Sequence, residues 1–269
     1  MSLAFRAENA GVEIAFESRG DGPPLLLVHG LGYGGRGWGP AYDLLAESFY
    51  VVAFDNRGFG QSDAPPGPYT VAELARDTGA VLEAAGVERA HVVGSSLGGM
   101  VAQEFALSFP ERVERLVLVG TTPGGPASYA MPLVTTRLML EAAALDPEVA
   151  LRLFVENALG AKGRADADLV EQILAYRRAS PPDPKGWHAQ GAAGAAFDVL
   201  DRLDSIRAET LVVHGTEDAV VDPRNGELLA ERIPNARLEL LAGCGHLPFW
   251  EQPERFCELV REFLEEGGQ

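Results

Sequence analysis

The sequence predicts an α/β protein in which a mostly parallel sheet is covered by helices on both faces and carries an inserted helical cap. Short apolar segments alternate with helical patterns along most of the chain. Most of these segments are continuously apolar, which is typical of parallel strands buried on both faces. The strand pattern is absent from residues 122–198, an Ala-rich helical stretch. We therefore expect residues 1–121 and 199–269 to form the core and residues 122–198 to form the cap.

The expected strands can be read in chain order. Residues 12–18 alternate apolar and polar side chains, as a half-exposed edge strand does. The continuous apolar segments then follow at residues 24–30, 50–55, 91–95, 115–120 and 210–215, with residues 236–243 as a further candidate.

Helices are expected between these strands. Thr70 followed by Glu73 has the spacing of a capping box, and the helical pattern then runs to about Ala85 and stops at Gly86. A last helix should begin near Pro253, a residue suited to the first turn. Its apolar residues recur at helical spacing on one face: Phe256, Leu259, Val260, Phe263 and Leu264.

Composition excludes several functional classes. The formal net charge of −17 disfavours nucleic acid and anionic membrane surfaces as partners. No apolar run reaches the roughly 20 residues that span a bilayer, and the N-terminus does not resemble a secretion signal, so we expect a cytoplasmic protein. Cys244 and Cys257 are expected to be reduced thiols, with a single disulfide between them left open.

The segment HVVGSSLGGM (91–100) contains the candidate nucleophile. Gly94, Ser96 and Gly98 satisfy G-x-S-x-G, and no other frame fits. This motif places a serine on a strained strand-to-helix turn, where larger residues two positions on either side would collide. The following helix directs its N-terminus towards the site, which favours developing negative charge.

A serine nucleophile needs a base and a carboxylate that orients the base. Asp218 follows an expected strand, and His246 lies in a loop before the last helix, so both belong at the carboxyl edge of the sheet. Chain order therefore makes Ser96, Asp218 and His246 the expected catalytic triad. Glu217 and Asp222 share the loop of Asp218 and remain alternatives for the acid.

The other four histidines fit the role of base less well. His91 begins a strand and is expected at the opposite edge of the sheet, and His214 ends a strand, where packing or loop bracing is expected. His29 belongs to a glycine-rich loop, and His188 lies in the cap. No spacing typical of a metal site is present, so no metal or other cofactor is expected.

Two glycine-rich loops follow strands. In the loop at residues 29–38, the amide of Leu31 is expected to form an oxyanion hole together with the amide of Leu97. The loop at residues 54–63 lacks a dinucleotide-binding fingerprint and is expected to brace the sheet edge.

Substrate-contacting residues can be suggested only by type. Trp38, Met131, Met139 and Trp187 are candidates for an apolar substrate pocket, and Phe154 and Tyr176 could also line it. Each of these also fits ordinary core packing. Among the arginines of the cap, a substrate carboxylate could be bound by Arg137, Arg152, Arg177 or Arg178, although a solvated surface position is favoured for each.

Taken together, these segments resemble the α/β-hydrolase superfamily over nearly the whole chain. The matching motifs are HGLG, DNRGFGQSD, GSSLGGM, HGTED and GCGHLPFWEQP, in the family's order. Within the superfamily, GSSLGGMVAQEFALSFPERV is similar to small bacterial esterases and 3-oxoadipate enol-lactonases. The resemblance implies an eight-stranded sheet, a helical cap after the sixth strand, no cofactor, and hydrolysis of a small ester or lactone. Enol-lactonases often carry a serine where this chain has Gly30.

Three other functions stay open. A carbon–carbon hydrolase of ring-fission diketones uses the same triad on this fold, and perhydrolase or haloperoxidase activity is a side reaction of such sites. From a different class, a ligand receptor can be built on a hydrolase fold with vestigial turnover. The sequence does not distinguish which ester or lactone is cleaved, nor the oligomeric state.

Overall fold

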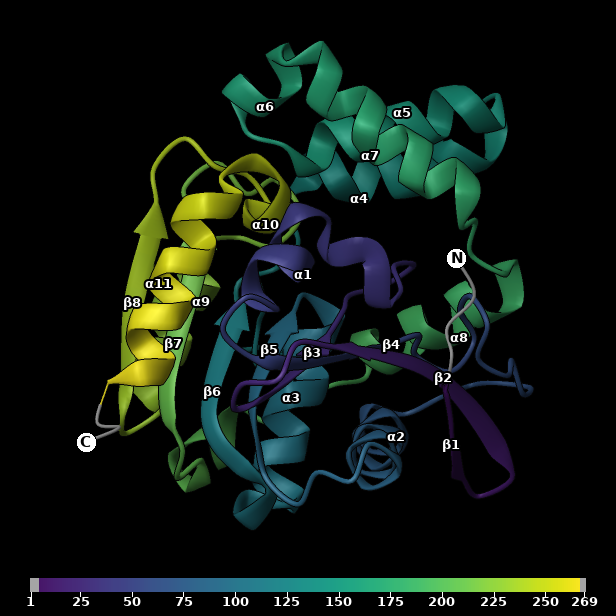
Figure 1. The fold of residues 1–269 in the computed structure, drawn as a ribbon. Helices are drawn as coiled ribbons and strands as arrows, with labels where there is room; N and C mark the ends of the chain where they lie inside the picture. Colours follow the sequence, from purple (N-terminus) through teal and green to yellow (C-terminus); the bar gives the residue numbers. More distant parts are fainter. Residues whose placement is uncertain (1–4, 267–269) are drawn as a thin grey trace.

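The computed structural model describes residues 5–266 as an eight-stranded sheet covered by helices (Figure 1). The strand order is β1-β2-β4-β3-β5-β6-β7-β8. The pairs β1–β2 and β2–β4 are antiparallel, and the remaining neighbours are parallel. The predicted fold class is therefore confirmed.

The strands are short and most are buried. Their bounds are β1 Phe5–Asn9, β2 Val12–Arg19, β3 Pro24–Val28, β4 Tyr50–Phe54, β5 Ala90–Ser95, β6 Val113–Val119, β7 Glu209–Gly215 and β8 Ala236–Leu241. The first of these was not recognised from the sequence pattern. Of its five residues only Ala7 is buried, so β1 has little apolar signal, and pairing with β2 rather than burial defines it.

Helices follow most of the strands. The α-helices are α1 Pro40–Leu45, α2 Val71–Ala84, α3 Leu97–Ser108, α4 Leu133–Glu141, α5 Pro147–Ala158, α6 Ala161–Ala165, α7 Ala167–Ala179, α8 Pro184–Ala195, α9 Arg224–Arg232, α10 Pro248–Glu251 and α11 Pro253–Glu265. Short 3₁₀ segments are η1 Gly35–Trp38, η2 Pro110–Arg112, η3 Ala142–Ala144 and η4 Leu200–Ser205.

Side chains of the central strands point alternately to the two faces of the sheet, which divides the core into two layers. In β3, Leu26 packs in the cluster that contains Phe105 of α3, whereas Leu25 packs in the cluster that contains Phe256 of α11. Successive side chains of a strand point to opposite faces, so a strand apolar at every position is buried on both sides. This is the pattern that the continuous apolar segments predicted.

The predicted helix ends of α2 and α11 are present. Thr70 Oγ1 accepts a hydrogen bond from the amide of Glu73 (3.2 Å), and Glu73 Oε2 accepts one from the amide of Thr70 (2.8 Å), which completes the capping box. The last helix begins at Pro253 as expected. Cys244 and Cys257 are both buried free thiols.

All the helices from α4 to α8 lie between β6 and β7 in the chain. Figure 1 shows α4, α5, α6 and α7 grouped above the sheet, while α8 lies lower, nearer β2. The contacts of α8 agree with this position, because Gln190 Nε2 donates to the carbonyl of Arg57 (2.7 Å). The inserted region therefore contacts the loop after β4 through α8, as well as the loop after β7 through α4 and α6.

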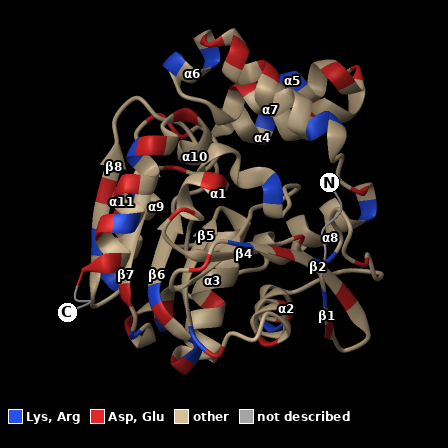
Figure 2. Ribbon diagram, viewed as in Figure 1, with Lys and Arg blue, Asp and Glu red and all other residues tan. Residues whose placement is uncertain are grey.

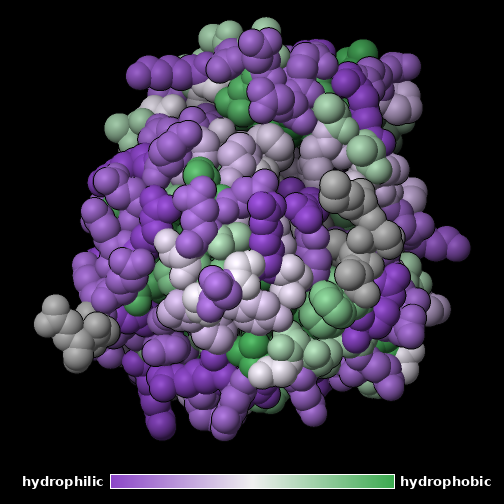
Figure 3. Space-filling view, viewed as in Figure 1, coloured by the Kyte–Doolittle hydropathy of each residue, from purple (hydrophilic) through white to green (hydrophobic). Residues whose placement is uncertain are grey.

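The surface carries both charge signs and a few apolar side chains. Figure 2 shows acidic residues on the inserted helices α5 and α7 and on α11 beside the sheet. The face seen in Figure 3 is mainly hydrophilic. Most of the strongly exposed large apolar residues belong to the α4–α5 region, including Leu133 (85%) and Leu140 (79%). No helix within residues 5–266 is long and apolar enough to cross a membrane.

Candidate active site

Ser96 occupies a strained turn between β5 and α3. Its φ of 56° and ψ of −121° are unusual for a residue with a side chain, and β5 ends at Ser95 while α3 begins at Leu97. Outside this turn, Ala10 is the other non-glycine residue with positive φ in the described part of the chain. The side chain of Ser96 is half-buried, whereas that of its neighbour Ser95 is buried.

Packing explains the glycines on either side of Ser96. A Cβ atom at Gly94 would collide with the carbonyl oxygen of Gly98, and a Cβ at Gly98 would collide with the carbonyl oxygen of Val28. Both obstacles are backbone atoms, which cannot move aside as a flexible side chain can. The first turn of α3 therefore lies directly against the ends of β5 and β3.

Asp218 and His246 form a hydrogen-bonded pair. Their loops follow β7 and β8, and His246 Nδ1 lies 2.8 Å from Asp218 Oδ2. Because an ionised carboxylate only accepts hydrogen bonds, Nδ1 must carry the proton. The lone pair of Nε2 is then available to accept a proton from a nucleophile.

Several donors keep Asp218 ionised. Burial would by itself raise its pKa, but the charge interaction with His246 and the hydrogen bonds from His214 and His246 outweigh burial and hold the pKa well below its usual range. The amides of Val220 and Val221 also donate to Oδ1, at 2.8 and 2.9 Å.

The two alternative acids point elsewhere. Glu217 is exposed and accepts a hydrogen bond from the amide of Ala161 in α6 (2.6 Å). Asp222 is paired with Arg224, which lowers its pKa. Of the three carboxylates in this loop, Asp218 is the one hydrogen-bonded to His246.

The end of β6 lies between the serine and the histidine. The amide of Ser96 donates to the carbonyl of Val119 (2.9 Å), and Thr121 Oγ1 donates to the carbonyl of Ser96 (2.7 Å). Between them, a Cβ at Gly120 would lie 3.1 Å from His246 Nδ1. The contacts of the described residues do not include a hydrogen bond from Ser96 Oγ to His246. In unliganded sites such bonds are often long and shorten when substrate binds.

The loop that contains Leu31 lies against Ser96. A Cβ at Gly30 would be 2.9 Å from Ser96 Cβ and 3.5 Å from its Oγ, so a serine at position 30 would crowd the nucleophile. Within residues 5–266, the backbone hydrogen bonds use neither the amide of Leu31 nor that of Leu97. Both donors are therefore free to bind an oxyanion.

Three other histidines lie outside the position of the base. His214 is completely buried, with Nε2 at 3.1 Å from both Asp218 Oδ2 and the carbonyl of Val221. Packing or loop bracing was expected for His214 from its place at the end of a strand, but its contact with Asp218 was not, because the two residues are joined by a turn after β7 that leaves no periodic signal. His91 lies at the opposite edge of the sheet, and His188 is exposed on α8.

His29 is buried beneath the glycine-rich loop. Its ring stacks on Tyr33 (4.7 Å between centroids) and contacts Trp38 and Phe249. Burial, with smaller contributions from the charges of His246 and Arg177, lowers the pKa of His29 to about 3 despite an opposing backbone hydrogen bond. His29 is therefore neutral at physiological pH.

The loop at residues 54–63 braces the sheet edge. The Asp55 carboxylate accepts hydrogen bonds from the amides of Gly35 (3.0 Å) and Gln61 (2.9 Å), which joins this loop to the glycine-rich loop. Asn56 Nδ2 donates to the carbonyl of His29 (3.0 Å). These contacts fix the segment immediately before Leu31.

The pocket candidates lie in different surroundings. Trp38 is completely buried in the core against Phe249 and Phe256. Met131 is 43% exposed, while Met139, Phe154 and Tyr176 are half-buried. Trp187 lies against the glycine-rich loop, because its Cδ1 would be 3.1 Å from a Cβ at Gly32.

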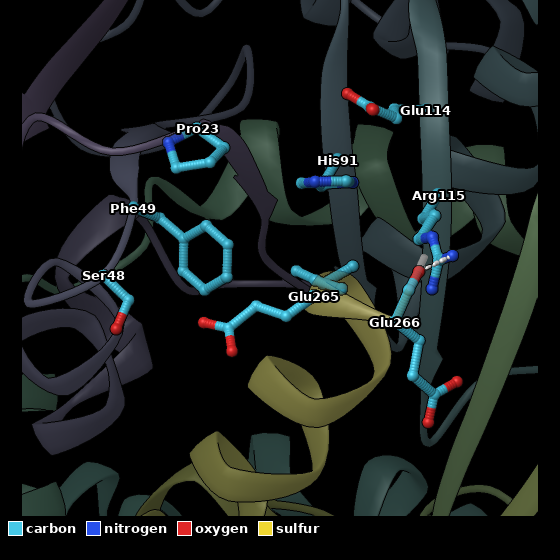
Figure 4. Close-up of a pocket in the computed structure, with 9 residues that line it drawn as sticks. Pro23, Ser48, Phe49, His91, Glu114, Arg115, Glu265 and Glu266 are labelled. Atoms are coloured by element: carbon cyan, nitrogen blue, oxygen red, sulfur yellow. Dashed lines mark hydrogen bonds between the residues drawn. The ribbon is translucent and has the colours of Figure 1, made fainter. Parts of the chain in front are cut away.

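Two hollows lie away from the triad. One, of about 370 Å³, is at the edge where β5 and β6 begin and is lined by His91, Glu114 and Arg115 (Figure 4). The other, of about 740 Å³, is lined by a proline-rich loop and by His188. Neither is lined by Ser96, Asp218 or His246.

Comparisons with known proteins agree with the fold. A family model described as the alpha/beta hydrolase fold matches residues 23–253. A 2-hydroxy-6-oxononadienedioate/2-hydroxy-6-oxononatrienedioate hydrolase of Burkholderia vietnamiensis is 35% identical over 89% of this chain and 86% of its own length. A Rhodococcus esterase is 30% identical, with a TM-score of 0.87 over 99% of both chains. The enol-lactonase of Burkholderia xenovorans is 26% identical, with a TM-score of 0.85 over 97% of this chain and 100% of its own.

Proposed function

Since the chain belongs to the α/β-hydrolase family, we propose that it is a serine hydrolase that cleaves a small carboxylic ester or lactone through an acyl-enzyme on Ser96. The observation that carries this proposal is the buried Asp218–His246 pair beside a serine on a left-handed strand-to-helix turn. In this proposal residues 122–198 serve as the cap over the site. The enzyme is expected to be cytoplasmic and to need no cofactor.

The reaction has two halves. Ser96 Oγ attacks the carbonyl carbon while its proton moves to His246 Nε2, and the amides of Leu31 and Leu97 stabilise the resulting oxyanion. When the carbon–oxygen bond breaks, His246 gives that proton to the leaving alcohol, or to the alkoxide end of an opened lactone. Water then attacks the acyl-enzyme, gives a proton to His246, and releases the acid as Ser96 regains its proton.

Asp218 has a supporting role throughout. It holds His246 with Nδ1 protonated and stabilises the imidazolium that forms after each proton transfer. Its low pKa keeps the carboxylate charged during the cycle.

Ser96→Ala tests the proposal directly. The wild type should hydrolyse p-nitrophenyl acetate and butyrate, and the variant should lose about three or more orders of magnitude in kcat. Circular dichroism should confirm that both proteins are equally folded. Equal turnover by the two proteins would refute Ser96 as the nucleophile.

A carbon–carbon hydrolase is the second candidate. The observation that favours it is the 35% identity to a hydrolase whose name specifies an oxo-dienedioate substrate. A ring-fission product supplied in place of the ester tests this candidate, with loss of its chromophore as the readout. Turnover of the ring-fission product without turnover of either ester would replace the first proposal with this one.

A further inference from the structure

The amide of Leu31 belongs to a tight turn. Residues Gly30 to Tyr33 form this turn, which is closed by a hydrogen bond from the amide of Tyr33 to the carbonyl of Gly30 (3.2 Å), with Gly32 at a φ of 70°. The Gly30 carbonyl and the Leu31 N–H share one planar peptide unit. Whatever fixes this turn therefore also fixes the direction of the Leu31 donor.

Helix α7 of the inserted region holds the same turn from outside. Arg177 Nη1 donates to the carbonyl of Gly32 (2.8 Å), and its guanidinium lies 4.3 Å from the centroid of the Tyr33 ring. The preceding residue, Tyr176, accepts a hydrogen bond at its hydroxyl from the amide of Gly34 (3.0 Å). Two adjacent residues of α7 thus contact three consecutive residues of the loop.

Tyr33 transmits this contact inwards. Its ring contacts both the guanidinium of Arg177 and the ring of His29, which is stacked on it at 4.7 Å and 11°. His29 in turn accepts a hydrogen bond at Nδ1 from the amide of Gly30 (2.7 Å), the first residue of the turn. A continuous series of contacts therefore joins Arg177 to the peptide before Leu31.

Arg177 differs from the arginines around it. Arg178 and Arg152 form ion pairs with glutamates on the exposed side of the cap. Among the described residues Arg177 has no carboxylate partner, and its Nε is buried without a hydrogen bond. Its charge is stabilised by a carbonyl and an aromatic face, both from the turn.

We propose that Arg177 is a positioning residue that holds the Leu31 amide in its oxyanion-binding orientation, so that this donor is in place only when α7 is seated on the turn. The inference rests on the proposed function, because it assigns Leu31 to the oxyanion hole. It adds that the inserted helices take part in building the hole as well as covering it. Arg177 itself does not touch the reacting atoms.

Replacement of Arg177 should affect the transition state more than ground-state binding. Arg177→Met removes the donor and the charge but keeps the aliphatic stem. We expect kcat for p-nitrophenyl acetate to fall about tenfold, less than the full loss of an oxyanion donor, with little change in KM. Arg177→Lys keeps a positive charge and a donor but loses the planar guanidinium that stacks on Tyr33. Its kcat should therefore lie between those of the wild type and Arg177→Met.

Phenylboronic acid provides the readout that a merely structural role would not change. Addition of Ser96 Oγ to boron, with the serine proton passing to His246, gives a tetrahedral anion that mimics the intermediate. In Arg177→Met, the dissociation constant for phenylboronic acid should rise by about the factor that kcat falls. Arg178→Met is the matched control on the same helix and should change each constant by a factor of no more than about two.

The outcomes separate this inference from the proposed function. Wild-type turnover combined with unchanged kcat in Arg177→Met would overturn the inference alone. A loss of kcat without loss of boronate affinity, or an equal loss in Arg178→Met, would also overturn it. A wild type that neither hydrolyses the ester nor binds the boronate would overturn both.

Discussion

Asp218 accepts hydrogen bonds from two histidines and two backbone amides. His246 and His214 both approach Oδ2, while the amides of Val220 and Val221 donate to Oδ1. A carboxylate that receives this many donors is strongly held in one orientation. The imidazole of His246 is consequently fixed in one tautomer.

Asp218→Asn should therefore abolish most activity without removing side-chain volume. The side-chain amide of asparagine would direct an N–H group at a histidine that now donates to Asp218 Oδ2. This favours the wrong tautomer of His246, so kcat should fall by about four orders of magnitude. Steady-state hydrolysis of p-nitrophenyl acetate measures the effect. Glu217→Gln and Asp222→Asn are the controls, and a comparable loss in either of them would transfer the orienting role to that residue.

His29 links protonation to stability. Burial lowers the pKa of His29 to about 3 in the folded protein, against 6.5 for an unburied histidine. Between pH 6.5 and pH 3, the unfolded chain therefore binds a proton at His29 that the folded chain does not. Stability should therefore fall as the pH drops below about 6.5, with a limiting slope from this residue of about 1.4 kcal/mol per pH unit.

His29→Gln should reduce that pH dependence. The glutamine carbonyl keeps an acceptor for the amide of Gly30, which His29 Nδ1 now provides, but it does not titrate. Urea unfolding at pH 7 and pH 4.5 should give a smaller stability difference for the variant than for the wild type. If the wild type and the variant lose the same free energy of unfolding between pH 7 and pH 4.5, His29 is already protonated in the folded protein at pH 4.5.

At the scale of elements, the junction of β5 and α3 depends on its glycines. A Cβ at Gly94 would collide with the backbone of Gly98 and the side chain of Ala102, whereas one at Gly79 in α2 would lie 3.6 Å from Cε2 of Phe105, an ordinary van der Waals contact. The two positions therefore differ in whether a methyl group can be accommodated.

Gly94→Ala and Gly79→Ala form a matched pair. The first should destabilise the protein by about 1–3 kcal/mol and lower activity, because α3 and Ser96 must move. The second should be neutral or stabilising by up to about 1 kcal/mol, because alanine favours the helix. Chemical denaturation measures both variants, and destabilisation of similar size in the two would contradict the steric account.

Elements with strong local patterns could be predicted from the sequence. The buried strands and the capping box of α2 depend on residues close together in the chain, and all are present. β1 was missed because it buries a single residue and depends on its partner β2. Its place at the sheet edge explains the weak signal.

At the scale of the whole molecule, the net charge of −17 opposes compactness. Raising NaCl from about 0.01 M to about 0.1 M shortens the screening length from about 30 Å to about 10 Å. We expect Tm to rise by about 2–4 °C, which corresponds to about 1 kcal/mol for a chain of this size. Differential scanning calorimetry measures this shift in Tm. KCl is the control and should give the same shift, because screening depends on ionic strength rather than on the cation. A lower Tm in salt would mean that the surface ion pairs contribute more than the overall repulsion.

The sequence by itself determined the fold class, the buried strands and the candidate serine. The strands depend on local apolar periodicity, and the serine depends on a steric motif of five residues, Gly94 to Gly98. Both involve residues close together in the chain, so they can be recognised without knowledge of distant contacts. Only the tertiary structure decided which carboxylate of the 217–222 loop meets His246, that Trp38 belongs to the core, and that Arg177 rather than Arg178 reaches the oxyanion turn. Neighbouring residues on a loop or helix point in different directions, so such contacts are fixed by packing between distant segments, which sequence spacing does not encode.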